Sequence, residues 1–235
     1  VVPYTDLQFF NGTGGFSKAG TEYIITTTPT LRTPAPWVNV LANPNFGTII
    51  SESGQSYTWI QNAHEFRLTP WNNDPVSDLK GEAFYLRDEE AGTVWSPAPL
   101  PCRGRSTYTT RHGFGYSIFE YSEDGIDSEM CVYVDIAASI KFIRLKLHNR
   151  SGRKRRLSAT GYMGWVLGDM RRKTIMHIVT GIDVASGSIF AKNAYNAEFE
   201  NKVVFFDVDD ANRTYTTDRT EFIGRNGTLA NPDAM

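Results

Sequence analysis

Alternating hydrophobic and polar positions dominate the second half of the chain. In residues 142–148, the side chains of Ile143, Leu145 and Leu147 share one face, and charged or polar residues occupy the other. This period of two is typical of a strand with one buried face. Residues 156–166 follow the same rule, so both segments are predicted to be strands of a sheet with one polar side.

Turn-forming residues separate further segments of this kind. Predicted strands lie at 22–27, 37–41, 47–51, 115–121, 126–134, 142–148, 156–166, 175–183, 188–193 and 203–207. No window longer than about ten residues carries an apolar repeat of helical period, so little helix is expected. Many short antiparallel strands indicate an all-β fold, a large antiparallel β-sandwich of two packed sheets.

Length and composition are those of an ordinary globular protein. The 235 residues, 40% hydrophobic and 21% charged, are expected to form a single β-sandwich domain over 1–235. A formal net charge of −2 argues against a nucleic-acid partner, because such domains are normally basic. No internal repeat or low-complexity segment stands out.

The cysteines and the chain ends add two expectations. Cys102 and Cys131 match neither a disulfide framework nor a metal-ligand spacing, which favours free thiols in a reducing compartment, while a single bridge also fits the count. The first residues lack the pattern of a signal peptide, and no stretch approaches the roughly 20 apolar residues of a membrane span. A start without Met and an end in turn formers indicate a fragment of a larger multidomain protein.

Residues 57–101 have a different composition. Trp59, Trp71 and Trp95 stand among amides, carboxylates and arginines, and prolines and glycines interrupt the stretch, which argues against plain core. Aromatic faces stack on the C–H faces of sugar rings, and planar polar groups hydrogen-bond to sugar hydroxyls. We therefore interpret this stretch as a sugar-contacting surface, with an aromatic core and polar turns as the alternative.

The candidate sugar-binding residues follow from that interpretation. They are Trp59, Asn62, Arg67, Trp71, Asn73, Asp74, Arg111 and His112. The two tryptophans are the stacking candidates, and the amide, guanidinium and carboxyl groups of residues 62–74 are the hydrogen-bonding ones. Arg111 and His112 belong to a second aromatic segment, 107–121, in which small glycines allow close approach of another chain or a sugar.

Catalytic motifs are missing. The sequence contains no G-x-S-x-G and no H-E-x-x-H, and its four histidines fall on separate predicted elements. The acidic run 88–90 is expected to be a solvated hairpin turn. The basic run 150–156 is expected to be a solvated turn between two strands. The run Arg171 to Lys173 is expected to be similar, with anchoring of another domain as the alternative because it follows an apolar segment. No catalytic residue, metal ligand or cofactor is therefore assigned.

Several long motifs resemble a known family. They are TPAPWVNVLANPNFGTIISESGQSYTWIQNAHEFRLTPWNNDPVSD, GEAFYLRDEEAGTVWSPAPLP, RHGFGYSIFEY, LSATGYMGWVLG, FENKVVFFDV and DRTEFIGRNGTLANP. In this order they resemble the amino-terminal β-sandwich of glycoside hydrolase family 94, a galactose-mutarotase-like super-sandwich. Within the family, the likeness is greatest to the carboxy-terminal phosphorylase-like region of cyclic β-1,2-glucan synthases.

The resemblance implies a modular parent enzyme. In that family a helical linker and an (α/α)6 barrel follow the sandwich, inorganic phosphate is the co-substrate, and a barrel aspartate acts as general acid. No residue here matches that aspartate, so the chain is expected to be a non-catalytic domain of a glycosyltransferase or inverting phosphorylase. Its expected partners are a β-glucan oligosaccharide, the helical linker and barrel of the same protein, and a second copy of the chain. The parent enzyme is expected on the cytoplasmic side of a bacterial inner membrane, without membrane contact by this chain. The alternative is a purely structural interaction domain.

Overall fold

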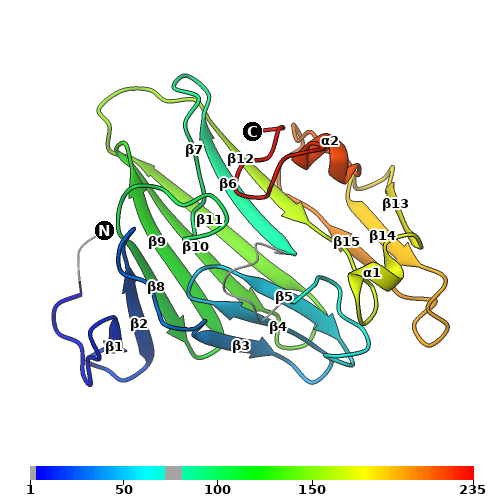
Figure 1. Ribbon diagram of the computed structural model, residues 1–235, viewed down its shortest axis with the longest axis horizontal. Helices are drawn as coiled ribbons and strands as arrows, with labels where there is room; N and C mark the ends of the chain where they lie inside the picture. Colours follow the sequence, from blue (N-terminus) through cyan, green and yellow to red (C-terminus); the bar gives the residue numbers. More distant parts are fainter. Residues whose placement is uncertain (1–3, 72–80) are drawn as a thin grey trace.

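The computed structural model describes residues 4–71 and 81–235, and nearly all of its regular elements are strands (Figure 1). In chain order they are β1 (Gly14–Phe16), β2 (Glu22–Thr27), β3 (Val38–Ala42), β4 (Phe46–Ser51), β5 (Ser56–Ile60), β6 (Glu82–Asp88), β7 (Val94–Trp95), β8 (Tyr108–Gly113), β9 (Tyr116–Glu123), β10 (Ile126–Val134), β11 (Lys141–Asn149), β12 (Leu157–Met163), α1 (Arg171–Thr174), β13 (Ile178–Ile182), β14 (Ile189–Asn193), β15 (Val203–Phe206) and α2 (Arg219–Ile223). The predicted all-β sandwich is confirmed.

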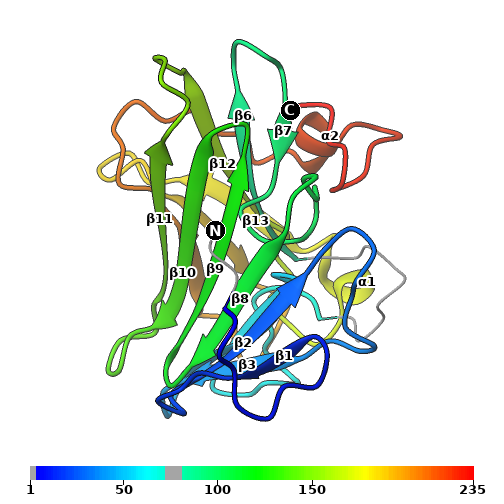
Figure 2. The ribbon, with the colours of Figure 1, turned by 90° about the vertical axis from the view of Figure 1, so that its left-hand side faces the viewer.

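One large sheet organises the molecule. Its six strands are ordered β1-β2-β8-β9-β10-β11, and every neighbouring pair is antiparallel. Three smaller sheets, β3-β4-β5, β12-β6-β7 and β13-β14-β15, lie to one side of it. Figure 2 shows the large sheet as a single twisted layer that faces the viewer, with the smaller sheets behind. We call the smaller ones the β4 sheet, the β6 sheet and the β14 sheet.

Apolar side chains fill the space between these layers. Phe119, Met130 and Val132 of the large sheet pack on Leu41 and Ile50 of the β4 sheet. This is what the period of two requires, because alternate residues of β9 and β10 face the core while those between them face outward.

The β6 sheet is covered on both faces. On one side, Leu86 and Trp95 pack with the stacked rings of Tyr108 and Tyr121, whose centroids are 3.8 Å apart. On the other side, Ala83, Tyr85 and Tyr162 pack against the carboxy-terminal residues Phe222, Ile223 and Leu229. A strand covered on both faces has no polar side, which explains why β6 shows no alternating pattern.

The sequence predictions differ from the structure in several places. The stretch 57–101 was expected not to be core, but Trp95 is only 1% exposed and β6 runs through the interior. Aromatic and aliphatic side chains of the β6 sheet and the large sheet surround Trp95, so this residue is not part of a surface. The strand predicted at 175–183 begins at Ile178, because α1 and the turn after it occupy the preceding residues.

The basic run 150–156 is the third difference. It does not close a hairpin, because β11 belongs to the large sheet while β12 pairs with β6. Nor is the whole run solvated: the side chain of Arg155 is 4% exposed and forms an ion pair with Asp88, which is fully buried. The loop therefore crosses between two layers and is held by a buried charge pair. The acidic run 88–90 also differs from its prediction as a solvated hairpin turn, because Asp88 ends β6 and is buried in this pair. Cys102 and Cys131 are both free thiols.

Candidate functional site

The aromatic residues predicted to contact sugar do gather on one surface. Tyr57, Trp59, Arg67 and Trp71 lie together on the side of the β4 sheet that faces away from the large sheet, and we call them the aromatic cluster. Alternation along β5 produces this arrangement. Ser56 and Thr58 point into the molecule, so the residues between and after them point outward.

Tyr57 is the base of the cluster. It is only 7% exposed, because the half-buried rings of Trp59 and Trp71 lie beside it with centroids at 5.3 Å and 5.5 Å. Their planes are tilted by 37° and 42° relative to the tyrosine ring, so neither tryptophan stacks flat on Tyr57. The guanidinium carbon of Arg67 lies 5.6 Å from the centroid of the tyrosine ring, within the range of a cation–π contact.

Gly47 allows Trp59 to lie flat on the sheet. The two residues face each other across β4 and β5. A Cβ atom at position 47 would lie 2.4 Å from Cζ2 of the indole, which is closer than any van der Waals contact. A residue with a side chain at position 47 is therefore incompatible with this ring position.

Arg67 and Asn62 give the cluster a polar edge. The backbone of Arg67 pairs with both Trp59 and Gly168, and its Nε donates to the carbonyl of Ala63 at 3.2 Å. Its two terminal nitrogens have no hydrogen-bond partner within residues 4–71 and 81–235. Asn62 Oδ1 accepts from the backbone of His64 and Glu65 at 2.9 Å and 3.0 Å. The side chain thus shapes the loop after β5 and leaves its amide nitrogen exposed.

The remaining candidates lie elsewhere. Asn73 and Asp74 fall outside the described residues. Arg111 and His112 are on β8 in the large sheet, where neither contacts the aromatic cluster. Arg111 forms ion pairs with Glu22 at 2.7 Å and with Glu120 at 3.3 Å. The guanidinium of Arg111 is therefore committed to contacts within the protein.

His112 is also committed to the protein. Its Nε2 lies 3.2 Å from the carbonyl oxygen of Trp37, which accepts only, so Nδ1 is left to accept from Ser117 Oγ at 2.9 Å. Burial lowers the pKa of His112 to about 4. The imidazole is consequently neutral and fixed in one tautomer.

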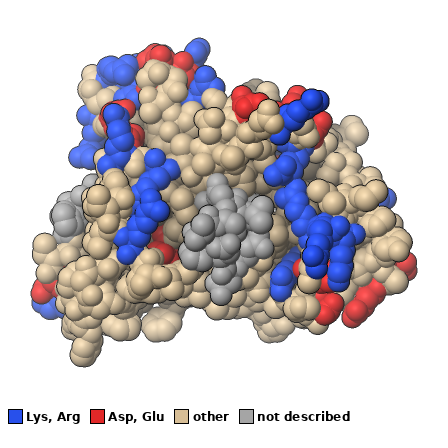
Figure 3. All heavy atoms as spheres, viewed as in Figure 1, with Lys and Arg blue, Asp and Glu red and all other residues tan. Residues whose placement is uncertain are grey.

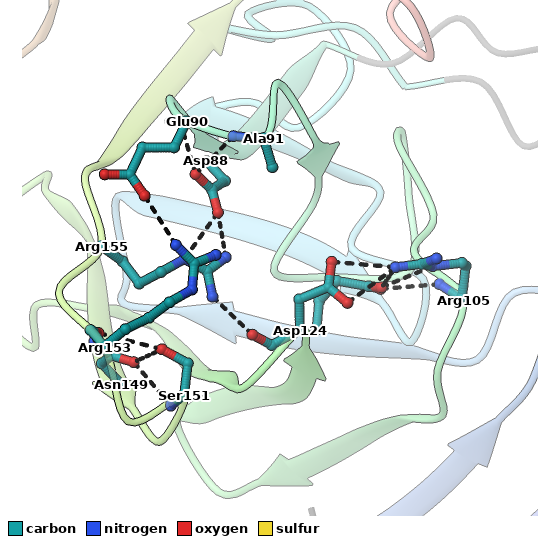
Figure 4. Close-up of polar contacts among 10 residues, drawn as sticks. Asp88, Glu90, Ala91, Arg105, Asp124, Asn149, Ser151, Arg153 and Arg155 are labelled. Carbon is teal, nitrogen blue, oxygen red and sulfur yellow. Dashed lines mark hydrogen bonds and ion pairs between the residues drawn. The ribbon is translucent and has the colours of Figure 1, made fainter.

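A second concave surface lies at the other end of β6. A hollow of about 420 Å³ is lined by Glu90, Lys154, Arg155 and Arg156. Figure 4 shows two arginines of this region with carboxylate partners: Arg155 binds Asp88, and Arg153 binds Glu90, with 3.0 Å between Nη1 and Oε2. None of the lining residues is aromatic, so the hollow suits a neutral sugar less well than the aromatic cluster does.

Basic side chains also gather near α1. On the face seen in Figure 3, blue side chains are concentrated where α1 lies, and this helix contains Arg171, Arg172 and Lys173. Lys173 forms an ion pair with Asp169. In the described part of the chain, no three His, Cys, Asp or Glu side chains gather as a metal ion requires. No helix among residues 4–71 and 81–235 is long and apolar enough to cross a membrane.

Two residues of the site were not found from the sequence. Tyr57 has the spacing of two from Trp59 that places side chains on one face of a strand, and this signal was available. Gly47 carries no local signal, because its role depends on the register between β4 and β5.

Comparison with known proteins gives a consistent picture. The family model described as "Glycosyl hydrolase 94, supersandwich domain" matches residues 21–235. The chain is 37% identical, over 98% of its length, to "Cyclic beta-(1,2)-glucan synthase NdvB" of Rhizobium meliloti (strain 1021). It is 28% identical over 94% of its length to "N,N'-diacetylchitobiose phosphorylase" of Vibrio furnissii, and 25% identical over 95% to "Solabiose phosphorylase" of Paenibacillus borealis.

The matches cover small parts of these relatives. The chain spans 8% of the length of the glucan synthase, 28% of the chitobiose phosphorylase and 30% of the solabiose phosphorylase.

Proposed function

The chain belongs to glycosyl hydrolase family 94, as its supersandwich domain, and from this premise we propose that it serves a β-glucan-processing transferase or phosphorylase by contacting the glucan. The contact surface is the aromatic cluster, which forms part of the rim of an active site located in another domain. The chain itself supplies no catalytic residue. Inorganic phosphate, where the whole enzyme uses it, binds outside this chain.

The aromatic cluster is the observation that supports this proposal. Trp59 and Trp71 are half-buried, so part of each residue is accessible while the rest packs against protein, including the ring of Tyr57. The two terminal nitrogens of Arg67, which have no partner among the described residues, and the amide nitrogen of Asn62 are donors beside these rings. Apolar faces with convergent polar groups are the usual arrangement for binding a sugar.

Titration of the chain with β-1,2-linked gluco-oligosaccharides, followed by intrinsic tryptophan fluorescence, tests the proposal. We expect a saturable change for the wild-type chain. Trp59→Ala and Trp71→Ala should each weaken binding about tenfold, which corresponds to the loss of one good contact. Gly47→Ala should weaken it as well, because the added methyl group displaces the Trp59 ring without removing it.

Phe114→Ala is the matched control. Phe114 is also an exposed aromatic residue, with 85% of its surface accessible, but it lies in the β8–β9 turn, away from the cluster. Its loss should leave the affinity for glucan unchanged. Equal affinities for all variants would contradict the proposal.

A second candidate function is supported by another surface. On the face of the β14 sheet that points away from the core, Val179, Val203 and Phe205 are between 53% and 62% exposed. An apolar surface of this kind favours a purely structural domain that packs against another domain or a second copy. In that case the chain should self-associate in light scattering, Val203→Asp should abolish the association, and glucan should leave the fluorescence unchanged.

A further inference from the structure

A buried polar group lies directly beneath the aromatic cluster. The Glu82 side chain at the start of β6 is 2% exposed and forms an ion pair with Lys141 Nζ of β11, whose side chain is 8% exposed. The two residues come from different sheets. Buried ions are tolerated only when they are paired and fully hydrogen-bonded, so the surroundings of this pair are informative.

Hydroxyl groups complete the shell of the carboxylate. Glu82 Oε1 accepts from Thr58 Oγ1 and Thr69 Oγ1, both at 2.7 Å, and Oε2 accepts from Ser56 Oγ at 2.6 Å as well as from Lys141. An ionised carboxylate has about four acceptor sites, and here all of them are occupied. The charge of Lys141 and these hydrogen bonds outweigh the effect of burial, so the pKa of Glu82 lies below its ordinary value.

The three hydroxyls belong to the segments that carry the aromatic cluster. Ser56 and Thr58 alternate with Tyr57 and Trp59 along β5, so inward bonds to one carboxylate determine how the outward rings are presented. Thr69 lies two residues before Trp71, and its Oγ1 also accepts from the backbone nitrogen of Thr58 at 3.0 Å. A single carboxylate therefore holds both tryptophan-bearing segments.

We propose that the Glu82–Lys141 ion pair is the positioning element of the aromatic cluster and fixes Trp59 and Trp71 relative to each other for the glucan. The link to glucan rests on the proposed function, while the link to the tryptophans rests on the described contacts alone. Lys141 orients the carboxylate, and the carboxylate orients Ser56, Thr58 and Thr69. Neither charged group touches the sugar.

Fluorine NMR of the chain labelled with 5-fluorotryptophan tests the positioning without any sugar. The resonances of Trp59 and Trp71 are assigned by replacing each with Phe. Glu82→Gln keeps the shape of the side chain but removes the charge opposite Lys141, and Lys141→Met removes the cation. Both variants should shift or broaden the two resonances and leave that of Trp95 in place.

Arg155→Met is the matched control. It breaks the other buried ion pair of β6, between Arg155 and Asp88, at the far end of the same strand. Any general loosening of β6 therefore occurs in this variant too, but the aromatic cluster should keep its spectrum. Unchanged Trp59 and Trp71 resonances in Glu82→Gln and Lys141→Met, or equal shifts in Arg155→Met, would overturn the positioning.

Thr69→Val covers the case in which the charge variants do not fold. It removes one hydroxyl donor from the carboxylate and should move the Trp71 resonance more than that of Trp59. In the sugar titration, Lys141→Met and Thr69→Val should weaken glucan binding by about tenfold or less, with Arg155→Met equal to wild type. Shifted resonances together with unchanged affinity would overturn the link to glucan. A wild-type chain that binds no glucan would contradict the proposed function, and the spectra alone would then decide whether the ion pair positions the tryptophans.

Discussion

Two buried glutamates of the same fold are stabilised in opposite ways. Glu82 is 3% exposed and has a lysine partner, whereas Glu52, just after β4, is 5% exposed and accepts from Thr33 Oγ1 and from the backbone nitrogen of Trp37 at 2.8 Å. Among the described residues, Glu52 forms no ion pair. Burial accordingly raises the pKa of Glu52, while Lys141 and the hydroxyls hold the pKa of Glu82 below its ordinary value despite burial.

A second buried group near Glu52, the imidazole of His112, also favours its uncharged form. The carbonyl of Trp37, whose amide binds Glu52, accepts from His112, and the pKa of that histidine is also shifted toward the uncharged form. The comparison teaches that burial alone does not define a functional charge. A buried carboxylate keeps its charge where a partner of opposite sign is buried with it, as Lys141 is with Glu82 under the aromatic cluster and Arg155 is with Asp88 at the far end of β6.

Loss of Lys141 should give the largest effect. Lys141→Met leaves the carboxylate buried without its cation, and we expect the free energy of unfolding at pH 7 to fall by about 3–5 kcal/mol. Urea denaturation measures this. Glu82→Leu combined with Lys141→Met should recover most of the lost unfolding free energy, because an apolar pair carries no desolvation cost. A double variant as unstable as Lys141→Met alone would contradict the comparison.

As the pH falls, we expect protonation of His112, near Glu52, to destabilise the fold. The folded-state pKa of His112 is about 4, below its value of 6.5 in an unfolded chain, so the histidine stabilises the fold above pH 6.5. This contribution declines as the pH falls toward 4, by up to ~3 kcal/mol. His112→Gln should flatten the pH dependence of the unfolding free energy over this range. If the unfolding free energy of His112→Gln falls with pH as steeply as that of the wild-type chain, groups other than His112 titrate in this range.

Removal of a single hydroxyl should have a smaller effect. Thr69→Val deprives Glu82 of one of four hydrogen bonds, and we expect a loss of about 1 kcal/mol in unfolding free energy. Hydrogen exchange should also become faster at the backbone amide of Thr58, which donates to the same hydroxyl. Protection unchanged at Thr58 would mean that β5 is held by other contacts.

Neutralising Glu52 should have the smallest effect. Because its pKa is raised above the usual 4.5, its contribution is present at low pH and is lost as the pH rises through the folded value. Glu52→Gln keeps an acceptor oxygen for the backbone nitrogen of Trp37, and its amide nitrogen faces the Thr33 hydroxyl, which accepts as well as donates. The variant should change the unfolding free energy at pH 7 by less than about 1 kcal/mol, toward greater stability. A loss as large as that of Lys141→Met would remove the distinction between the two glutamates.

Strands with one solvent-exposed face could be predicted from the sequence. The bounds of β10 agree with the predicted 126–134, where charged and uncharged residues alternate at the start of the strand, and those of β2 agree with the predicted 22–27. β6 could not be found in this way, because both of its faces are covered and its terminal carboxylates resemble surface residues. Its partners, Lys141 and Arg155, lie 59 and 67 residues further along the chain.

The candidate site was predictable only where it is local. Trp59, Arg67 and Trp71 fall within one short stretch, so their proximity follows from the chain itself. Whether Arg111 and His112 would join them depended on which sheet contains β8, and no local pattern encodes that. The ion pair between Glu82 and Lys141 could not be predicted for the same reason. A charged residue in the sequence is recognised as buried only once its partner, here on another sheet, is known.

Binding of glucan to the aromatic cluster is the central claim, and one spectrum tests it most directly. The wild-type chain labelled with 5-fluorotryptophan is titrated with a β-1,2-linked gluco-oligosaccharide and observed by fluorine NMR. Saturable shifts of the Trp59 and Trp71 resonances, with the other three tryptophans unchanged, are the predicted result. Resonances that all stay in place, or shifts confined to Trp37, Trp95 or Trp165, would contradict the account.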